Sequence, residues 1–170
     1  MCGIVGYIGQ NQAMPVLIKG LKKLEYRGYD SSGIAVFSDH LQVVKTKGRL
    51  ADLEEKIKTD GSINGCVGIG HTRWATHGAP DDVNAHPHTS SNGRISVVHN
   101  GIIENYLPLR TELEKKGYTF VSETDTEVVA QLFDAYYNGD MVDTMIRVIQ
   151  KIRGSYALGV LCQEKPDEII

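Results

Sequence analysis

The stretch that decides the fold is Met-Cys-Gly-Ile-Val-Gly, residues 1–6. Methionine aminopeptidase removes Met1 when the next side chain is small, and cysteine is small enough. Cys2 would then carry both a thiol and a free α-amine, whose pKa of about 7.7–8.0 leaves a minority neutral at pH 7. A nucleophile beside its own base is the pairing that covalent catalysis requires. The alternative is a small buried cysteine in an N-terminal strand, because free cysteine often serves only as core.

Length and composition exclude several classes of protein. The chain has 170 residues, enough for one domain with a sizeable core, and a net charge of -3. That charge gives no argument for binding nucleic acid or an anionic membrane, and no apolar run approaches the roughly 20 residues of a membrane span. The three cysteines, Cys2, Cys66 and Cys162, have no paired spacing and fit a reducing compartment. We therefore expect a cytoplasmic protein without a nucleic-acid or membrane partner.

Hydrophobic periodicity predicts an α+β fold. Apolar residues at helical spacing predict helices over residues 14–26, 49–58, 104–116, 127–137 and 140–152. Short apolar runs predict strands over residues 2–9, 33–37, 41–46, 66–71, 95–99 and 155–162, with residues 38–40 as a hairpin turn. The clustering of strands and helices is typical of antiparallel sheets covered by helices. Residues 169–170 resemble the start of a further strand, so we expect the chain to end inside its domain.

Residues 99–101, His-Asn-Gly, follow the strand predicted over 95–99. A nucleophile that attacks an amide carbon creates an oxyanion, which fixed N–H donors stabilise. Asn100 and Gly101 can supply a side-chain N–H and a backbone N–H within two residues. The alternative is a turn, because Asn-Gly is a common hairpin signal.

Residues 71–78, His-Thr-Arg-Trp-Ala-Thr-His-Gly, lead into a stretch from 73 to 94 that shows no period. Such stretches inside a domain are usually disordered or functional, and the only tryptophan argues against disorder. Arg73 offers a bidentate fork for a carboxylate, and Trp74 can cover a small ligand. Thr76 and His77 add hydrogen-bonding groups, and Gly78 gives the loop freedom to move. The alternative is a surface loop with an incidental tryptophan.

Asp125 stands where the helix over 127–137 opens, within Thr124–Glu127, which has the pattern of a capping box. It can complement the helix N-terminus or bind an ammonium group. In the second case Arg73 and Asp125 would hold the two charged groups of a free amino acid. Arg27 can orient the Cys2 terminus or cap the helix that precedes it.

Five histidines, His71, His77, His86, His88 and His99, suggest a metal site, but only 86–88 has tight spacing. No acidic or thiol ligand accompanies that pair, whereas structural zinc sites use four ligands at regular spacing. The glycine-rich run 65–70 has no helix after it, so phosphate binding is not expected. We expect neither a metal nor another cofactor.

Taken together, these motifs resemble the class II glutamine amidotransferase family, and specifically the branch that aminates fructose 6-phosphate. The matching stretches are residues 2–6, 71–78, 84–88, 99–101 and 122–127, in order along the chain. The resemblance implies an N-terminal nucleophile fold, a four-layer αββα sandwich. It also implies that Cys2 forms a γ-glutamyl thioester with its own α-amine as base. Glutamine would yield glutamate and ammonia.

The resemblance implies roles for the other motif residues as well. Asn100 and Gly101 resemble the oxyanion hole, while Arg73 and Asp125 resemble the groups that bind the α-carboxylate and α-amine of glutamine. The loop expected to close over glutamine contains Trp74, Thr76, His77 and Gly78, and the positions near the site are His86 and Arg27.

The resemblance covers residues 1–170 as a glutaminase domain, which we expect to be truncated at its C-terminal end. Fructose 6-phosphate would be reached only through sugar-isomerase domains that this chain lacks, and the full-length enzyme is expected to be a homo-oligomer. Two alternatives stay open: the glutaminase half of another class II enzyme, such as an amidophosphoribosyltransferase, and an inactive glutamine-binding module.

Overall fold

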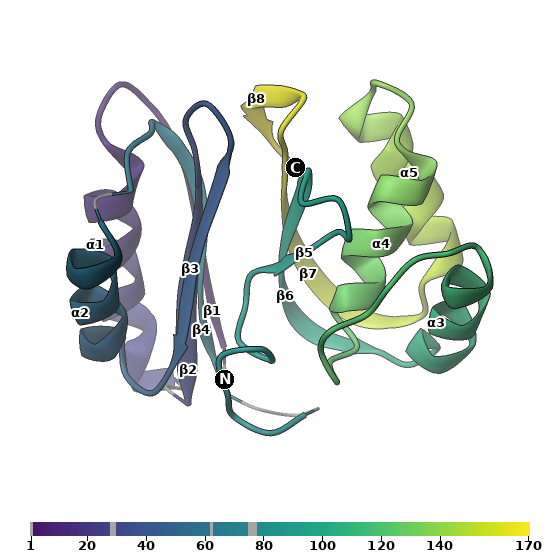
Figure 1. The fold of residues 1–170 in the computed structure, drawn as a ribbon, viewed down its shortest axis with the longest axis horizontal. Coiled ribbons are helices and arrows are strands. Elements are labelled where there is room, and N and C mark those ends of the chain that lie inside the picture. Colours follow the sequence, from purple (N-terminus) through teal and green to yellow (C-terminus); the bar gives the residue numbers. More distant parts are fainter. Residues whose placement is uncertain (1, 28–29, 62, 75–77) are drawn as a thin grey trace.

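The computed structural model describes residues 2–27, 30–61, 63–74 and 78–170, which fold into four layers (Figure 1). One sheet has the order β1-β4-β2-β3, and the other has the order β5-β6-β7-β8; all pairings are antiparallel. The strands are β1 (Gly3–Ile8), β2 (Ser31–Phe37), β3 (Leu41–Lys47), β4 (Val67–Arg73), β5 (His88–Thr89), β6 (Ile95–Ile103), β7 (Gly154–Cys162) and β8 (Lys165–Ile169).

Helices cover the outer face of each sheet, which confirms the predicted α+β class (Figure 1). The first sheet is covered by α1 (Ala13–Leu24) and α2 (Leu50–Asp60), and the second by α3 (Tyr106–Lys115), α4 (Glu127–Tyr136) and α5 (Met141–Lys151). Among the residues described, no helix is long and apolar enough to cross a membrane.

Apolar clusters fill the spaces between the four layers. Alternation along β2 explains this arrangement, because Ile34 and Val36 pack against the helices while Ala35 faces the opposite sheet. The apolar cluster buried between the two sheets consists of Ala35, Val67, Ile69, Val98 and Leu161. The two sheets therefore pack face to face through an apolar centre.

Glycines in β4 set the distance between the first sheet and α1. A Cβ at Gly68 would lie 2.9 Å from Leu17 Cδ1, and one at Gly70 would lie 3.0 Å from Leu21 Cδ1. The absence of side chains at these two positions therefore allows α1 to pack closely on the centre of the sheet.

The structure corrects four sequence-based expectations. The apolar run over residues 2–9 predicts a buried strand, but β1 is an edge strand in which only Gly3 is fully buried. The strand predicted to end at residue 99 continues to Ile103, so Asn100 and Gly101 lie within β6 rather than in a turn. The strand expected to start near residue 169 begins at Lys165.

The fourth correction concerns the predicted capping box over residues 124–127. Thr126 is the residue that precedes α4, and its side chain makes no capping hydrogen bond. The Glu127 carboxylate instead accepts hydrogen bonds from the backbone N–H groups of Val121 and Ser122 and from the Ser122 hydroxyl. This carboxylate therefore anchors the segment before the helix instead of closing a box at its first turn.

Candidate active site

Cys2 lies beside the end of β4. Strand β1 pairs with β4 so that Gly3 lies opposite Thr72, which brings residue 2 next to Arg73 and Trp74. The backbone N–H of Trp74 donates to the Cys2 sulfur at 3.2 Å, and the thiol lies 3.6 Å from the Trp74 carbonyl oxygen. Cys2 is half-buried, so its thiol is held in place by backbone groups and is not enclosed within a core.

Asn100 reaches Cys2 from the second sheet. Its Nδ2 donates to the Cys2 carbonyl oxygen at 3.4 Å, and β1 packs against β6. Two motifs separated by 98 residues in the sequence therefore meet across the space between the sheets. The structure brings together the predicted nucleophile and the predicted side-chain donor.

Gly101 occupies a backbone conformation that only glycine adopts readily. Its φ is +129°, and a Cβ at this position would lie 1.9 Å from the Ser155 carbonyl oxygen of the neighbouring strand. The Asn-Gly pair is therefore fixed by strand pairing with β7, which holds its amide groups rigidly.

The two predicted charged anchors are both buried and both bonded to the backbone. Arg73 is 3% exposed and donates to the carbonyl oxygens of Gly78 at 3.3 Å and Ala79 at 3.5 Å. Asp125 is 4% exposed, and its Oδ2 accepts the Ile103 N–H at 2.7 Å. Asp125 is thus tied to the end of the strand that carries Asn100.

The remaining predicted residues are distributed around this centre. Trp74 is 57% exposed, directly after β4. Gly78 has φ +76° and accepts the Arg73 bond through its carbonyl oxygen. Arg27 ends the short 3₁₀ helix Glu25–Arg27. Thr76 and His77 lie outside the described residues, so the loop expected to close over glutamine is described only at its two ends.

Four buried histidines form a cluster between the sheets that the sequence did not predict. The rings of His71 and His86 stack with their centroids 4.2 Å apart, and His86 meets His88 edge-on at 4.7 Å. The Thr126 hydroxyl lies 2.9 Å from Nε2 of His86 and 2.8 Å from Nδ1 of His99. His86 therefore belongs to this cluster, where it contacts the residue just before α4.

Burial keeps the rings of His71, His86 and His88 neutral at neutral pH. Loss of hydration lowers the pKa of His71 to about 4 and holds the pKa values of His86 and His88 well below the usual range. A positive charge on His71 would lower the pKa of His86 further, and the Lys45 charge lowers that of His88. No group of three or more His, Cys, Asp or Glu side chains in the described segments could hold a metal ion.

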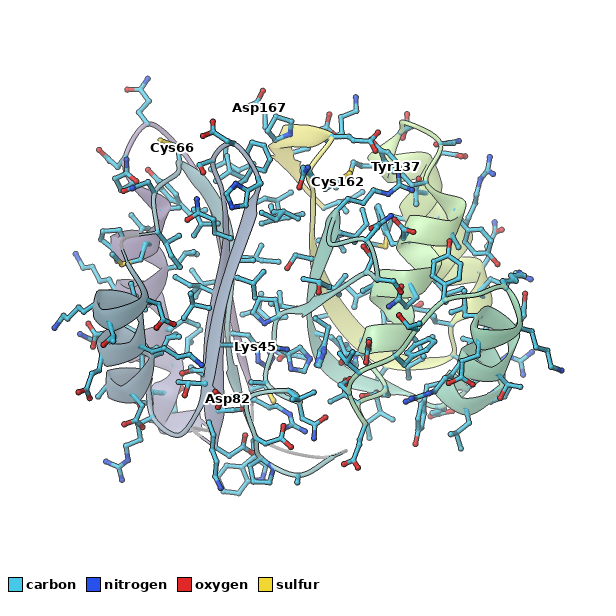
Figure 2. The ribbon with its side chains drawn as sticks, viewed as in Figure 1. Lys45, Cys66, Asp82, Tyr137, Cys162 and Asp167 are labelled. Atoms are coloured by element: carbon cyan, nitrogen blue, oxygen red, sulfur yellow. The ribbon has the colours of Figure 1, made fainter. Side chains whose placement is uncertain are left out.

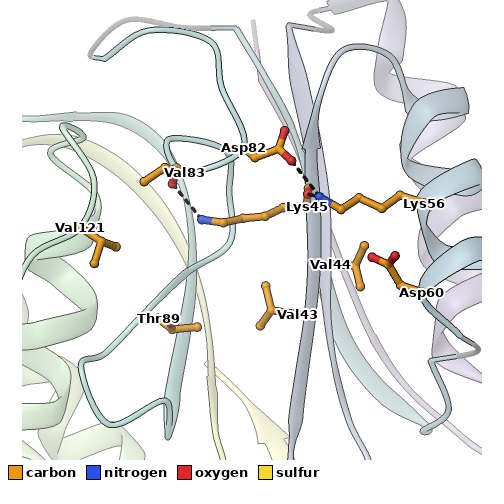
Figure 3. A pocket seen from close by; sticks show the side chains of 9 residues that line it. All are labelled: Val43, Val44, Lys45, Lys56, Asp60, Asp82, Val83, Thr89 and Val121. Atoms are coloured by element: carbon orange, nitrogen blue, oxygen red, sulfur yellow. Dashed lines mark hydrogen bonds and ion pairs between the residues drawn. The ribbon is translucent and has the colours of Figure 1, made fainter.

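Lys45 is a further polar residue that sequence reasoning missed, and it is half-buried. Its ammonium group donates to the carbonyl oxygen of Val83 at 2.9 Å, a bond drawn in Figure 3, and to that of Ala85 at 2.7 Å. Both acceptors lie just before His86, and Lys45 is labelled in Figure 2. Alternation along β3 was the available signal, because Leu41 and Val43 on the same face contact the centre between the sheets. Burial is the main cause that lowers the pKa of Lys45 to about 8.

A pocket of about 400 Å³ lies beside this lysine (Figure 3). It is lined by Val43, Val44, Lys45, Lys56, Asp60, Asp82, Val83, Thr89 and Val121. At its rim, Lys56 bridges β3 and the 82–85 segment by donating to the Lys45 carbonyl oxygen and to Asp82. None of the lining residues is a predicted site residue, so this pocket is distinct from the Cys2 centre.

Comparison with known proteins agrees with this geometry. Residues 71–170 match the family model of the glutamine amidotransferase domain. The chain is 60% identical over its whole length to glutamine–fructose-6-phosphate aminotransferase (isomerizing) of Caldanaerobacter subterraneus subsp. tengcongensis and 58% identical to that of Clostridium tetani. It spans 28% of the length of each of these relatives.

Solved structures show the same fold. Glutamine phosphoribosylpyrophosphate amidotransferase from B. subtilis superimposes with a TM-score of 0.81 at 26% identity, over 96% of this chain and 35% of that one. A second structure, described as the allosteric regulatory enzyme of purine biosynthesis, gives 0.82 at 26% identity, over 96% of this chain and 36% of that one. Two facing antiparallel sheets covered by helices define a domain of the N-terminal nucleophile class. The chain belongs to the glutamine amidotransferase domain family.

Proposed function

We propose that residues 1–170 form the glutaminase domain of a longer glutamine–fructose-6-phosphate aminotransferase. In this domain Cys2 hydrolyses glutamine to glutamate and ammonia. The observation that carries the proposal is the meeting of Cys2 and Asn100, whose Nδ2 lies 3.4 Å from the Cys2 carbonyl oxygen although the two residues are on different sheets. The identity of 60% to an enzyme of that name supports the choice of acceptor.

The reaction begins with removal of Met1, which frees the α-amine of Cys2. This amine accepts the thiol proton, and the sulfur attacks the side-chain carbonyl carbon of glutamine. The Asn100 side-chain N–H and the Gly101 backbone N–H stabilise the oxyanion that forms. As the intermediate collapses, the C–N bond breaks, the amine returns the proton to the leaving nitrogen, and ammonia departs. Water then attacks the γ-glutamyl thioester while the α-amine takes a proton from it. The C–S bond breaks, the amine passes the proton to the sulfur, and glutamate leaves.

Charged side chains at the site select a free amino acid. In this proposal Arg73 binds the α-carboxylate of glutamine and Asp125 binds the α-ammonium group. Each of the two side chains is more than nine-tenths buried, which supports these roles. A charge-assisted hydrogen bond gains strength in such surroundings. Trp74, Thr76, His77 and Gly78 are the residues that would cover the bound substrate, and His86 and Arg27 complete the proposed set of site residues. In the longer enzyme, ammonia passes to fructose 6-phosphate on further domains.

Labelling with an electrophilic glutamine analogue, followed by peptide mapping, tests the nucleophile directly. We expect one modified peptide that begins at residue 2, and an intact mass that shows Met1 removed. The Cys2→Ala variant should fold and release no glutamate from glutamine, with Cys66→Ala as the matched control that keeps full activity. Glutamate release at the parent rate by Cys2→Ala would refute the assignment.

A further inference from the structure

The ring of His71 has no role in the reaction described above, yet it contacts the proposed oxyanion donor. His71 lies in β4 with no exposed surface, and its Nε2 is 2.9 Å from Oδ1 of Asn100. The same nitrogen is 3.0 Å from the backbone carbonyl oxygen of His99. One nitrogen of the first sheet therefore contacts two neighbouring oxygens of the second sheet.

These two contacts fix the position of the proton on the ring. A backbone carbonyl oxygen can only accept a hydrogen bond, so Nε2 must carry the hydrogen that it shares with the His99 oxygen. Nδ1 of His71 is buried and has no hydrogen-bond partner among the described residues, so a second proton there would be buried without an acceptor. The ring is thus the neutral Nε2–H form.

This proton in turn fixes the orientation of the Asn100 amide. An N–H donor that faces the amide stabilises the orientation with Oδ1 toward His71, because the rotated amide would place its NH₂ group against another donor. Nδ2 must then point the other way, where it lies 3.4 Å from the Cys2 carbonyl oxygen. We propose that His71 is a positioning residue that holds the N–H face of the Asn100 amide toward Cys2. The inference rests on the proposed function, since it explains how that donor is preorganised.

The surroundings keep the His71 ring from rotating. Strand β4 is paired on both sides, with His71 opposite Ile4 of β1 and Gly33 of β2. One face of the ring stacks on His86 at a centroid distance of 4.2 Å and an angle of 27°. A ring held by two strands and a stacked neighbour can orient the amide without moving during the reaction.

The ring tautomer can be measured without any activity. In long-range ¹⁵N–¹H spectra of the 170-residue chain at pH 7, we expect His71 to show a protonated Nε2 and an unprotonated Nδ1. An Nδ1–H ring or a doubly protonated ring would overturn the proposal, whether or not the chain hydrolyses glutamine.

Kinetics test the consequence for Asn100. Gln at position 71 can place an N–H near the position of Nε2, whereas Asn places its N–H near the position of Nδ1. We expect the kcat of His71→Gln to stay within about 3-fold of the parent value. The kcat of His71→Asn should fall by about 10- to 100-fold with KM nearly unchanged. This loss is no larger than the loss of kcat that removal of an oxyanion donor causes. Equal kcat values for the two variants would overturn the proposal.

A double-mutant cycle separates positioning from a general structural effect. If His71 acts through Asn100, His71→Asn should cause no further loss of kcat when it is added to Asn100→Ala. Additive losses would overturn the proposal. Alkylation of Cys2 by iodoacetamide needs no oxyanion hole, so its unchanged rate in each variant serves as the control for a folded site. Failure of the proposed function would appear differently, as glutamate release that survives Cys2→Ala.

Discussion

Replacing Lys45 with methionine should change how the stability of the protein depends on pH. The Lys45 ammonium group is bonded to the Val83 and Ala85 carbonyl oxygens, and burial lowers its pKa from 10.5 to about 8. Between these two values the unfolded chain binds more protons than the folded one, so the free energy of unfolding rises with pH across this window. A neutral amine keeps two N–H donors, which match the two carbonyl oxygens.

The magnitude follows from the two pKa values. Each unit of difference between the two pKa values corresponds to about 1.36 kcal/mol. Integrated from pH 7 to pH 9.5, the free energy of unfolding of the parent chain rises by about 2 kcal/mol relative to that of Lys45→Met. At pH 7 the substitution removes two hydrogen bonds, which lowers the free energy of unfolding. It also removes the desolvation cost of the ammonium group, which raises it. We therefore expect the stability of the variant to lie within about 2 kcal/mol of the parent.

Urea unfolding at several pH values between 7 and 9.5 measures this difference. Other lysines, tyrosines and thiols titrate in both proteins, so their contributions cancel when the two curves are subtracted. Lys47→Met is the matched control, because Lys47 follows on the same strand and is exposed. The free energies of unfolding of the parent and of Lys45→Met should differ by an amount that changes with pH. A constant difference, as expected for the control, would refute the claim that the folded state lowers the pKa of Lys45.

Three further predictions concern the site. Arg73→Ala should raise KM for glutamine by about 10- to 150-fold, because a hydrogen bond to a charged group contributes about 1.5–3 kcal/mol; steady-state kinetics with an unchanged KM would remove Arg73 from the site. Gly101→Ala should destabilise the chain by more than about 2 kcal/mol, because its Cβ would lie 1.9 Å from the Ser155 oxygen. Gly93→Ala, also at positive φ but with nothing within 4 Å, should cost less in thermal unfolding. Stability should also fall as pH decreases below 6.5, because the unfolded chain then binds more protons than a fold in which His71 has a pKa of about 4. The pKa difference of His71 alone lowers the free energy of unfolding by about 2 kcal/mol between pH 7 and pH 5. Equal urea midpoints at these two pH values would contradict the prediction.

Sequence periodicity predicted the helices, most of the strands and the class of fold, but it did not predict the short strand β5. The hairpin of β2 and β3 and the helix α2 were both predicted, because alternation and helical spacing report directly on burial. The end of β6 was not predicted. Asn-Gly usually favours a turn, but pairing with β7 continues through both residues, and this tertiary pairing overrides the local preference.

The sequence predicted the residues of the candidate site but not the contacts among them. Motifs around Cys2, Arg73, Asn100 and Asp125 are visible in the sequence because each carries distinctive chemistry. The contacts among them depend on how two sheets face each other, and no local pattern encodes that. The role of His71 is an example, since only the packing of β4 against β6 places its ring against the Asn100 amide.

The neutral state of the histidine cluster explains how a polar site can lie between two packed sheets. An isolated charge in this position would carry a large desolvation cost, whereas a neutral imidazole needs only a hydrogen-bond partner. His71, His86 and His88 each have such a partner in Asn100, Thr126 and Thr124, respectively. The cluster therefore contributes directed N–H groups and lone pairs without adding charge beside Cys2. In surroundings of low polarity, fixed dipoles of this kind act strongly on an oxyanion, since they need not reorganise when it forms. The same burial that makes the fold sensitive to acid is thus what allows Asn100 to be held in a single orientation.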